Sequence, residues 1–362
     1  MDVVELILAR SDVEDVVRCK SVCKSWYNLI SSNYFVKAHL KRSYDNNRQH
    51  GYLRILLKWG IIKLRNCMIV DSSNGLVINK LRNCMIVGSF NGLVCISDNE
   101  DELLLVTNPS TREVRKLPKP YIKYRGKVCC SGFGYDSLTN DYKVVAGFNI
   151  SEHHMRFQVL SLKSNEWEFI GDNNNLTYNC SSDDLNCGFS YDGALHWFVY
   201  DTKKEKKVIL SFDLSLEKFK EIPLPNDTDY VYDEIDRLGM FEEHLCIFRS
   251  YDIFAINRQI WVMKNYSCWE LVPLDYEGNK YGAAINAYTL DRFPDNTWRL
   301  CNDYQGNVDM SCQSWFYISY PIFVRSLVSP YPCGKPKKNT NNKSEEVVLK
   351  WIIALMNGKA DS

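Results

Sequence analysis

The sequence of 362 residues lacks the motifs by which most enzymes and metal proteins are recognised. It has no Gly-x-Ser-x-Gly elbow, no P-loop and no His-Glu-x-x-His pair. Its 14 cysteines include no Cys-x-x-Cys pair. Cys19 and Cys23 have no histidine nearby, so we interpret them as reduced, small apolar side chains. The adjacent His153 and His154 would point to opposite faces of a strand. We therefore expect no metal, no cofactor and no catalysis.

Excess charge and long apolar runs are also missing. Lys plus Arg and Asp plus Glu both number 44, which argues against a role on nucleic acid or an anionic membrane. The longest apolar run, at 347–356, falls far short of the ~20 residues that span a bilayer. The amphipathic N-terminus carries acidic residues from position 2 and does not have the form of a secretory signal. We expect a cytoplasmic or nuclear protein, or one found in both places.

The stretch 13–32, VEDVVRCKSVCKSWYNLISS, has an apolar pattern that indicates helix. Val13, Val16 and Val17 follow the spacing i, i+3, i+4, and later apolar residues continue it on one helical face or on two packed faces. Ser11 followed by Glu14 has the form of a capping box, which predicts a helix start. So short a segment cannot bury this stripe alone. We expect it to pack on the rest of the chain or on a partner.

Residues 2–40 resemble the plant form of the F-box, most specifically in the run VCKSW at 22–26. In that family the apolar stripe docks on the Skp1 adaptor of an SCF ubiquitin ligase. The resemblance implies that the following residues face the adaptor or form the small F-box core: Ile7, Leu8, Val13, Val16, Val17, Val22, Cys23, Trp26, Leu29 and Ile30. The family's opening Leu-Pro-x-Glu/Asp turn would precede Met1-Asp2, and Ser11-Asp12 replaces a second Leu-Pro. We therefore expect an N-terminally incomplete F-box at 1–45. Either its adaptor binding is weakened, or a truncated gene model omits the opening turn.

The larger part of the chain repeats itself at an interval of about 50 residues. Four segments share an extended apolar stretch, a polar turn and then a bulky residue, at the equivalent positions Val114, Trp167, Phe219 and Trp269. A turn followed by an apolar strand recurs between them, beginning at residues 91, 141, 192, 243 and 295. Asn-Gly and Asp-Gly suit the positive φ angles of tight hairpins, and the flanking residues are typical of strands. Each repeat therefore predicts one four-stranded propeller blade.

Closing such blades into a ring leaves only short, protected edges, so we predict a β-propeller of about six blades. Five repeats are visible, and further strands would have to come from residues 52–82 and 312–328. Several segments resemble the F-box-associated domain of plant F-box proteins, and the match covers most of residues 86–330: GFGYDSLTNDYKVV (132–145), NPSTR (108–112), SLKSNEWEFI, GALHWFVY, IWVMKNYSCWELV and SLVSP (326–330). The kelch Gly-Gly doublet is missing, so the repeats are kelch-like at most.

The predicted fold class is α+β in two parts, a small helical F-box followed by an all-β kelch-like propeller. Between them, residues 46–85 form a linker with a local duplication, since 63–77 recurs at 80–94 with 13 of 15 positions identical. The propeller is expected at 86–330. A polar tail follows at 331–362, with helix signals at 345–358.

These resemblances imply a non-catalytic adaptor. Residues 1–45 would bind a Skp1-like adaptor of a cullin–RING ligase, and the propeller would hold an unknown substrate protein, a glycoprotein among the candidates. Loops at one rim would select it, with 173–186 and 226–237 as candidates. Two alternatives remain open: a propeller that binds proteins beside a degenerate, non-functional F-box, and a propeller enzyme with converging side chains in its channel.

Overall fold

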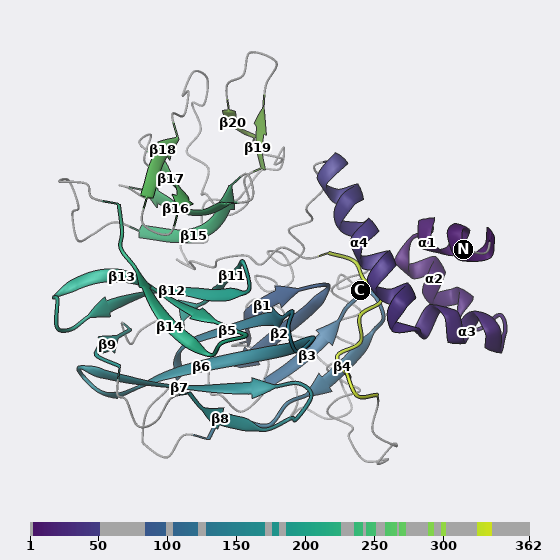
Figure 1. Ribbon diagram of the computed structural model, residues 1–362, viewed down its shortest axis with the longest axis horizontal. Helices are drawn as coiled ribbons and strands as arrows, with labels where there is room; N and C mark the ends of the chain where they lie inside the picture. The colour runs from purple at the N-terminus through teal and green to yellow at the C-terminus, as the bar shows by residue number, and fades with distance from the viewer. Residues whose placement is uncertain are drawn as a thin grey trace, which may run out of the picture.

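The computed structural model describes a set of helices followed by a series of antiparallel sheets (Figure 1). The residues that it describes are 3–50, 84–98, 104–121, 128–170, 176–180, 186–225, 235–241, 244–250, 258–265, 268–272, 289–292, 298–301 and 324–334. The first copy of the duplication, at 63–77, and the predicted tail helix lie outside these residues.

The N-terminal part consists of four helices, α1 Val3–Arg10, α2 Val13–Cys19, α3 Lys24–Ser31 and α4 Asn33–His50. The predicted stripe therefore lies on two short helices. The capping-box prediction is wrong: Asp12 is the N-cap of α2 and makes no side-chain cap bond. Ser11 instead serves the preceding helix, because its Oγ donates to the Ile7 carbonyl at 2.9 Å, where α1 ends and leaves carbonyls without helical partners.

The remaining elements form consecutive sheets in a curled, propeller-like arrangement (Figure 1). Their strands pair antiparallel, except that the short β10 pairs parallel with β5. The first has the order β1-β2-β3-β4, with Cys84–Phe90, Leu93–Asp98, Leu104–Asn108 and Glu113–Lys116. The second, β10-β5-β6-β7-β8, contains Asn186–Cys187, Val128–Asp136, Asp141–Ser151, His154–Ser161 and Trp167–Phe169. The third, β11-β12-β13-β14, contains Phe189–Tyr191, Ala194–Asp201, Lys206–Asp213 and Lys218–Ile222, and β9 (Tyr178–Asn179) pairs with β12.

The fourth sheet, β15-β16-β17-β18, contains Ile235–Phe241, His244–Ser250, Arg258–Asn265 and Cys268–Val272. A two-stranded sheet of β19 (Thr289–Arg292) and β20 (Trp298–Cys301) lies at the position of the fifth repeat. Of the residues predicted to supply further strands, 324–328 have no regular secondary structure, and 52–82 and 312–323 lie outside the described residues.

Two of the predicted hairpin turns join the first two strands of the first sheet and of the third. Asn91 and Gly92 adopt φ angles of 52° and 82°, and Asp192 and Gly193 adopt 47° and 72°. These left-handed conformations match the two-residue turns that carry the right-handed twist of a hairpin. The prediction of one sheet per interval of about 50 residues is therefore confirmed over the first four repeats.

In the second, third and fourth sheets, the recurring bulky residue contacts the preceding sheet. Trp167 Nε1 donates to the Pro118 carbonyl at 2.9 Å, and Trp269 Nε1 donates to the Pro223 carbonyl at 2.8 Å. In both cases the acceptor follows the last strand of the preceding sheet. Phe219 has no such donor and instead packs on Phe157 of the preceding sheet, with ring centroids 4.7 Å apart. The repeat therefore encodes contacts between sheets as well as strands within them.

A late segment of the chain is bound to the first sheet. Asn108 Nδ2 donates to the carbonyls of Ser326 (3.0 Å) and Val328 (2.6 Å), and Ser326 Oγ donates to the Asn91 carbonyl (2.6 Å). Tyr331 Oη donates to the Val114 carbonyl at 2.6 Å. Figure 1 shows this segment in yellow beside α4 and the first sheet. Two motifs more than two hundred residues apart, NPSTR and SLVSP, thus meet directly.

Candidate functional site

The helices bury a small core of their own. Four of the ten residues predicted to face an adaptor or to form this core are buried in it: Leu8, Val13, Val16 and Ile30. Val17, Trp26 and Leu29 are partly buried against the same core. The core is completed from outside the helical pattern, because Phe35 of α4 and Leu327 of the late segment are buried in it too.

The other three predicted residues lie at the surface. Ile7 is 59% exposed and Val22 is 62% exposed, while Cys23 is the exposed N-cap of α3. The Cys23 sulfur accepts a hydrogen bond from the Trp26 backbone N–H at 3.5 Å, so it caps a helix and does not pack as an apolar side chain. Contact of any of the ten residues with an adaptor stays a prediction.

Sequence reasoning missed further exposed apolar residues on the same helices. Val3 and Leu6 on α1 are 67% and 39% exposed, and Tyr27 on α3 is 55% exposed. Exposed apolar side chains that gather in one contiguous patch are typical of surfaces that bind another protein. The amphipathic pattern of the N-terminus was the signal that could have identified Val3 and Leu6.

The helices are attached to the first two sheets through α4. Tyr44 Oη donates to Asn91 Oδ1 at 3.1 Å, and Asn91 Nδ2 donates to Tyr142 Oη at 3.1 Å. Val36 and Leu40 pack against the core between these sheets. An open groove runs along this junction, lined by Lys37, Leu40, Lys41, Tyr44, Asp45, Asn91 and Tyr135.

Two further contacts fix the short helices to this junction. The buried His39 of α4 lies with Nε2 3.0 Å from the Ser11 carbonyl, at the end of α1. Arg325 Nη1 lies 3.3 Å from Glu14 Oε1, and its neighbour Leu327 enters the helical core. The helices are therefore held in one orientation relative to the sheets.

The meander topology gives the ring of sheets two distinct rims. In the first three sheets the turns from β1 to β2, from β5 to β6 and from β11 to β12, and the turns that precede β4, β8 and β14, lie on one side. We call this side the helix-side rim because Asn91 meets α4 there. The described turns from β6 to β7 and from β12 to β13, together with residues 176–180 between the second and third sheets, lie on the other side, the far rim. At the far rim Thr202 Oγ1 donates to the carbonyls of His153 (3.2 Å) and Thr177 (3.0 Å).

The described residues of the two segments predicted to select a substrate lie on the side of the far rim. Segment 173–186, of which residues 176–180 and 186 are described, connects the second sheet to the third. Segment 226–237 connects the third sheet to the fourth, and β15 begins within it at Ile235. The described residues of these two segments and the helices are therefore on opposite sides of the sheets.

A buried ion cluster holds the second and third sheets together at the helix-side rim. Lys143 Nζ lies 3.1 Å from Asp136 Oδ2 and 2.8 Å from Glu217 Oε1, and it donates to the Leu214 carbonyl at 2.6 Å. Burial opposes ionisation of Asp136, but hydrogen bonds from Ser215, Thr139 and Lys143 hold its pKa well below the ordinary value. Each charge has its partners, so the cluster has the character of a structural contact and not of a reactive site.

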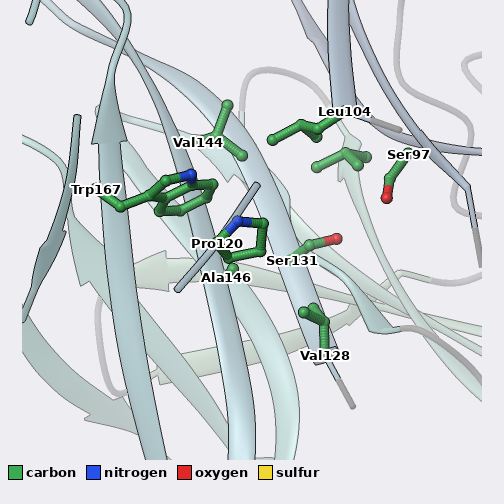
Figure 2. Close-up of a pocket in the computed structure, with 9 residues that line it drawn as sticks. Ser97, Leu104, Pro120, Val128, Ser131, Val144, Ala146 and Trp167 are labelled. Carbon is green, nitrogen blue, oxygen red and sulfur yellow. The ribbon is translucent and has the colours of Figure 1, made fainter. Parts of the chain in front are cut away.

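A small gap lies between the first and second sheets (Figure 2). Figure 2 shows Trp167, Pro120 and Val144 on one side and Leu104 and Ser97 on the other. Its lining consists of apolar side chains and two serine hydroxyls, and none of the nine described lining residues is titratable. Proton transfer in this gap would have no side-chain acid or base.

Comparison with protein families assigns both parts of the chain. The F-box domain model matches residues 1–38, and the model of the F-box associated beta propeller domain matches residues 62–272. This chain belongs to the F-box proteins with an F-box-associated β-propeller. The F-box is therefore the helical unit described above, and the propeller is the series of sheets.

The relatives of this F-box protein come from Arabidopsis thaliana. It is 30% identical over 295 residues to F-box protein CPR1, covering 74% of this chain and 70% of the relative. It is 28% identical over 308 residues to F-box protein At5g49610, covering 75% and 77%. It is 26% identical over 248 residues to F-box/kelch-repeat protein At3g23880, covering 62% and 65%. These findings support a substrate-recognition F-box protein, and F-box proteins are generally non-catalytic adaptors.

No helix among the described residues is long and apolar enough to cross a bilayer.

Proposed function

We propose that this F-box protein is the substrate-recognition subunit of an SCF-type E3 ubiquitin ligase. Its F-box binds a Skp1-like adaptor, and its propeller binds a protein destined for ubiquitination, in the cytoplasm or the nucleus. The chain forms no covalent intermediate with ubiquitin. It acts by proximity, since a substrate lysine held near the charged conjugating enzyme has a high effective concentration.

One observation carries this proposal. The F-box buries a core of its own and still leaves Ile7 and Val22 about 60% exposed. Removing such side chains from water on binding contributes roughly 25 cal/mol per Å² of apolar surface. The rigid junction at α4 adds a second support, because a ligase needs its substrate held in a fixed position relative to the adaptor. The far-rim loops are then free to meet the substrate.

The test is binding of the full chain to a purified Skp1 homologue. Val22→Lys and Ile7→Lys place a charge on the proposed contact, and each is expected to weaken binding at least tenfold, which corresponds to about 1.4 kcal/mol. Leu138→Lys and Leu216→Lys are the matched controls, because these leucines are 78% and 64% exposed on the propeller. All four variants should keep the melting temperature of the parent, since each altered side chain is already in water.

Two results would contradict the proposal. If the folded parent protein does not bind the Skp1 homologue, the chain is a protein-binding propeller beside a non-functional F-box. If Val22→Lys and Ile7→Lys bind as well as the two controls, the adaptor contacts a different surface.

A further inference from the structure

Three cysteines, two of them adjacent in the sequence and the third about fifty residues later, lie together at the far rim. The Sγ atoms of Cys129, Cys130 and Cys180 are all within 4.8 Å of one another, and all three residues are buried. They lie in the core between the second and third sheets, next to Met155 and Trp197. The hydrogen bonds that Cys130 and Cys180 direct to Cys129 lower the pKa of the Cys129 thiol, although burial opposes this.

A β-bulge explains how two adjacent cysteines enter the same core. Successive residues of a regular strand point to opposite faces, so Cys129 and Cys130 would be separated by the sheet. The register between β5 and β6 shifts here, because Val128 faces Phe148 and Cys130 faces Gly147, which leaves Cys129 as an extra residue. Such a bulge re-aims a side chain. Gly147 is also needed, since a Cβ at this position would come within 2.4 Å of Cys130 Sγ.

The third cysteine comes from the connection between the second and third sheets. Cys180 follows β9, and its carbonyl accepts a hydrogen bond from Asn149 Nδ2 at 3.1 Å. Oxygen atoms also approach the cluster: Cys129 Sγ lies 3.4 Å from the Gly147 carbonyl and 3.5 Å from Asn149 Oδ1. The donor set at this point is three sulfurs with oxygens beside them.

We propose that Cys129, Cys130 and Cys180 form a thiolate site for a thiophilic metal ion, Zn²⁺ or Cu⁺. Soft thiolate ligands select these ions. With Zn–S bonds of about 2.3 Å, the sulfurs of a tetrahedral site lie roughly 3.8 Å apart, so closing the cluster from 4.8 Å needs a shift of at most about 1 Å. Each thiol that becomes a ligand releases its proton to solvent. No electron is transferred, so no oxidant is needed.

The charge and the ligand number fit Zn²⁺ well. Three thiolates and one Zn²⁺ leave a single net negative charge, and an oxygen donor completes four-fold coordination. The bound ion would cross-link β5 to residues 176–180, which belong to the segment 173–186. It would thereby fix the base of a loop predicted to select the substrate, which gives the site a role in recognition without catalysis.

Metal binding to the full chain, reduced and handled without oxygen, tests this site. Zn²⁺ is titrated against a chromophoric chelator, and Cu⁺ is titrated against bicinchoninate, so that the two arms identify the ion. Substitution by Co²⁺ reports the ligands of the parent protein directly, because thiolates give an intense sulfur-to-metal charge-transfer band. We expect one tightly held ion per chain with three sulfur ligands. This measurement does not depend on any variant folding.

The variants compare the same chemical change at two buried positions. Cys180→Ser should weaken binding more than tenfold, whereas Cys95→Ser, a buried cysteine in the first sheet, should leave it unchanged. Equal binding by the two variants, or a parent protein that takes up neither ion, would overturn the proposal. A parent protein two hydrogens lighter, with Cys180 joined to Cys129 or Cys130, would also overturn it in favour of a disulfide.

Discussion

Buried polar side chains illustrate what single residues contribute to this propeller. His196 on β12 is buried with both ring nitrogens near partners: Nδ1 lies 3.3 Å from the Phe189 carbonyl, and Nε2 lies 3.1 Å from Ser211 Oγ. A neutral imidazole satisfies both contacts, with Nδ1–H donating and Nε2 accepting. Burial disfavours the imidazolium and lowers the pKa of His196 to about 4. The neighbouring Trp197 is fully buried, as expected for a blade strand.

This histidine predicts a loss of stability in mild acid. The unfolded chain binds a proton near the ordinary histidine pKa of about 6.5 and the folded chain only near 4, so acidification between these values favours unfolding. From pH 6.5 to 4.5 the contribution is about 2 kcal/mol of unfolding free energy. His196→Gln should remove this part of the pH dependence in urea unfolding. The exposed His153→Gln should keep the full dependence, and equal slopes for both variants would refute the assignment.

The sequence predicts only some of the contacts between residues of different sheets. The resemblance marked GFGYDSLTNDYKVV as a motif, but it gave no reason for Asp136 and Lys143. Their partner Glu217 lies in a turn of the next sheet, and no local pattern connects positions that far apart. The same holds for the three cysteines, because a β-bulge has no signal in residue spacing. Short-range rules identify the residues of a strand, but not which of them meet across two sheets.

At the scale of elements, hairpins were predictable because their turns require unusual backbone angles. Asn91-Gly92 and Asp192-Gly193 signal positive φ, and they recur at the interval of the sheets. The two helices that carry the apolar stripe were harder to separate from the sequence. The apolar spacing continues through residues 20–23, although these residues are not helical. The break lies at Cys23, because its backbone is extended and its sulfur caps the start of α3.

The recurring tryptophans predict how strongly neighbouring sheets are joined. Trp167→Phe keeps most of the packing and loses the hydrogen bond to Pro118, so we expect a loss of about 1 kcal/mol of unfolding free energy. Trp167→Ala also leaves a cavity and should cost about 3 kcal/mol. Phe169→Ala is the control, because this residue of the same strand is 46% exposed. In urea unfolding, Phe169→Ala should change the free energy of unfolding by less than about 0.5 kcal/mol. A larger loss for Phe169→Ala than for Trp167→Ala would contradict the contact.

At the scale of the whole molecule, the F-box and the propeller share a core. Leu327 is the link, because it comes from the late segment bound to Asn108 and yet lies among the F-box residues. Its role could not be read from the sequence, since Leu327 is separated from Val16 by most of the chain. The family matches fixed the order of the two parts, but not how they contact each other.

Loosening this link should be visible in the F-box. We expect Leu327→Ala to lower the free energy of unfolding by about 2–3 kcal/mol, because it leaves a cavity. It should also reduce hydrogen-exchange protection in α1–α3 more than in β5–β7. Leu138→Ala, at an exposed propeller position, should change neither. If protection falls in the sheets while the helices are unaffected, Leu327 supports the propeller alone.

The two rims of the propeller also bear on how such a receptor can diversify. A strand such as β12, of eight residues, spans roughly 26 Å between them. Substitutions in the described far-rim turns therefore lie outside direct contact with the α4 junction. In the proposed ligase subunit, substitutions at one rim would change the substrate while selection preserves the other rim, so one adaptor contact would serve a gene family with many targets.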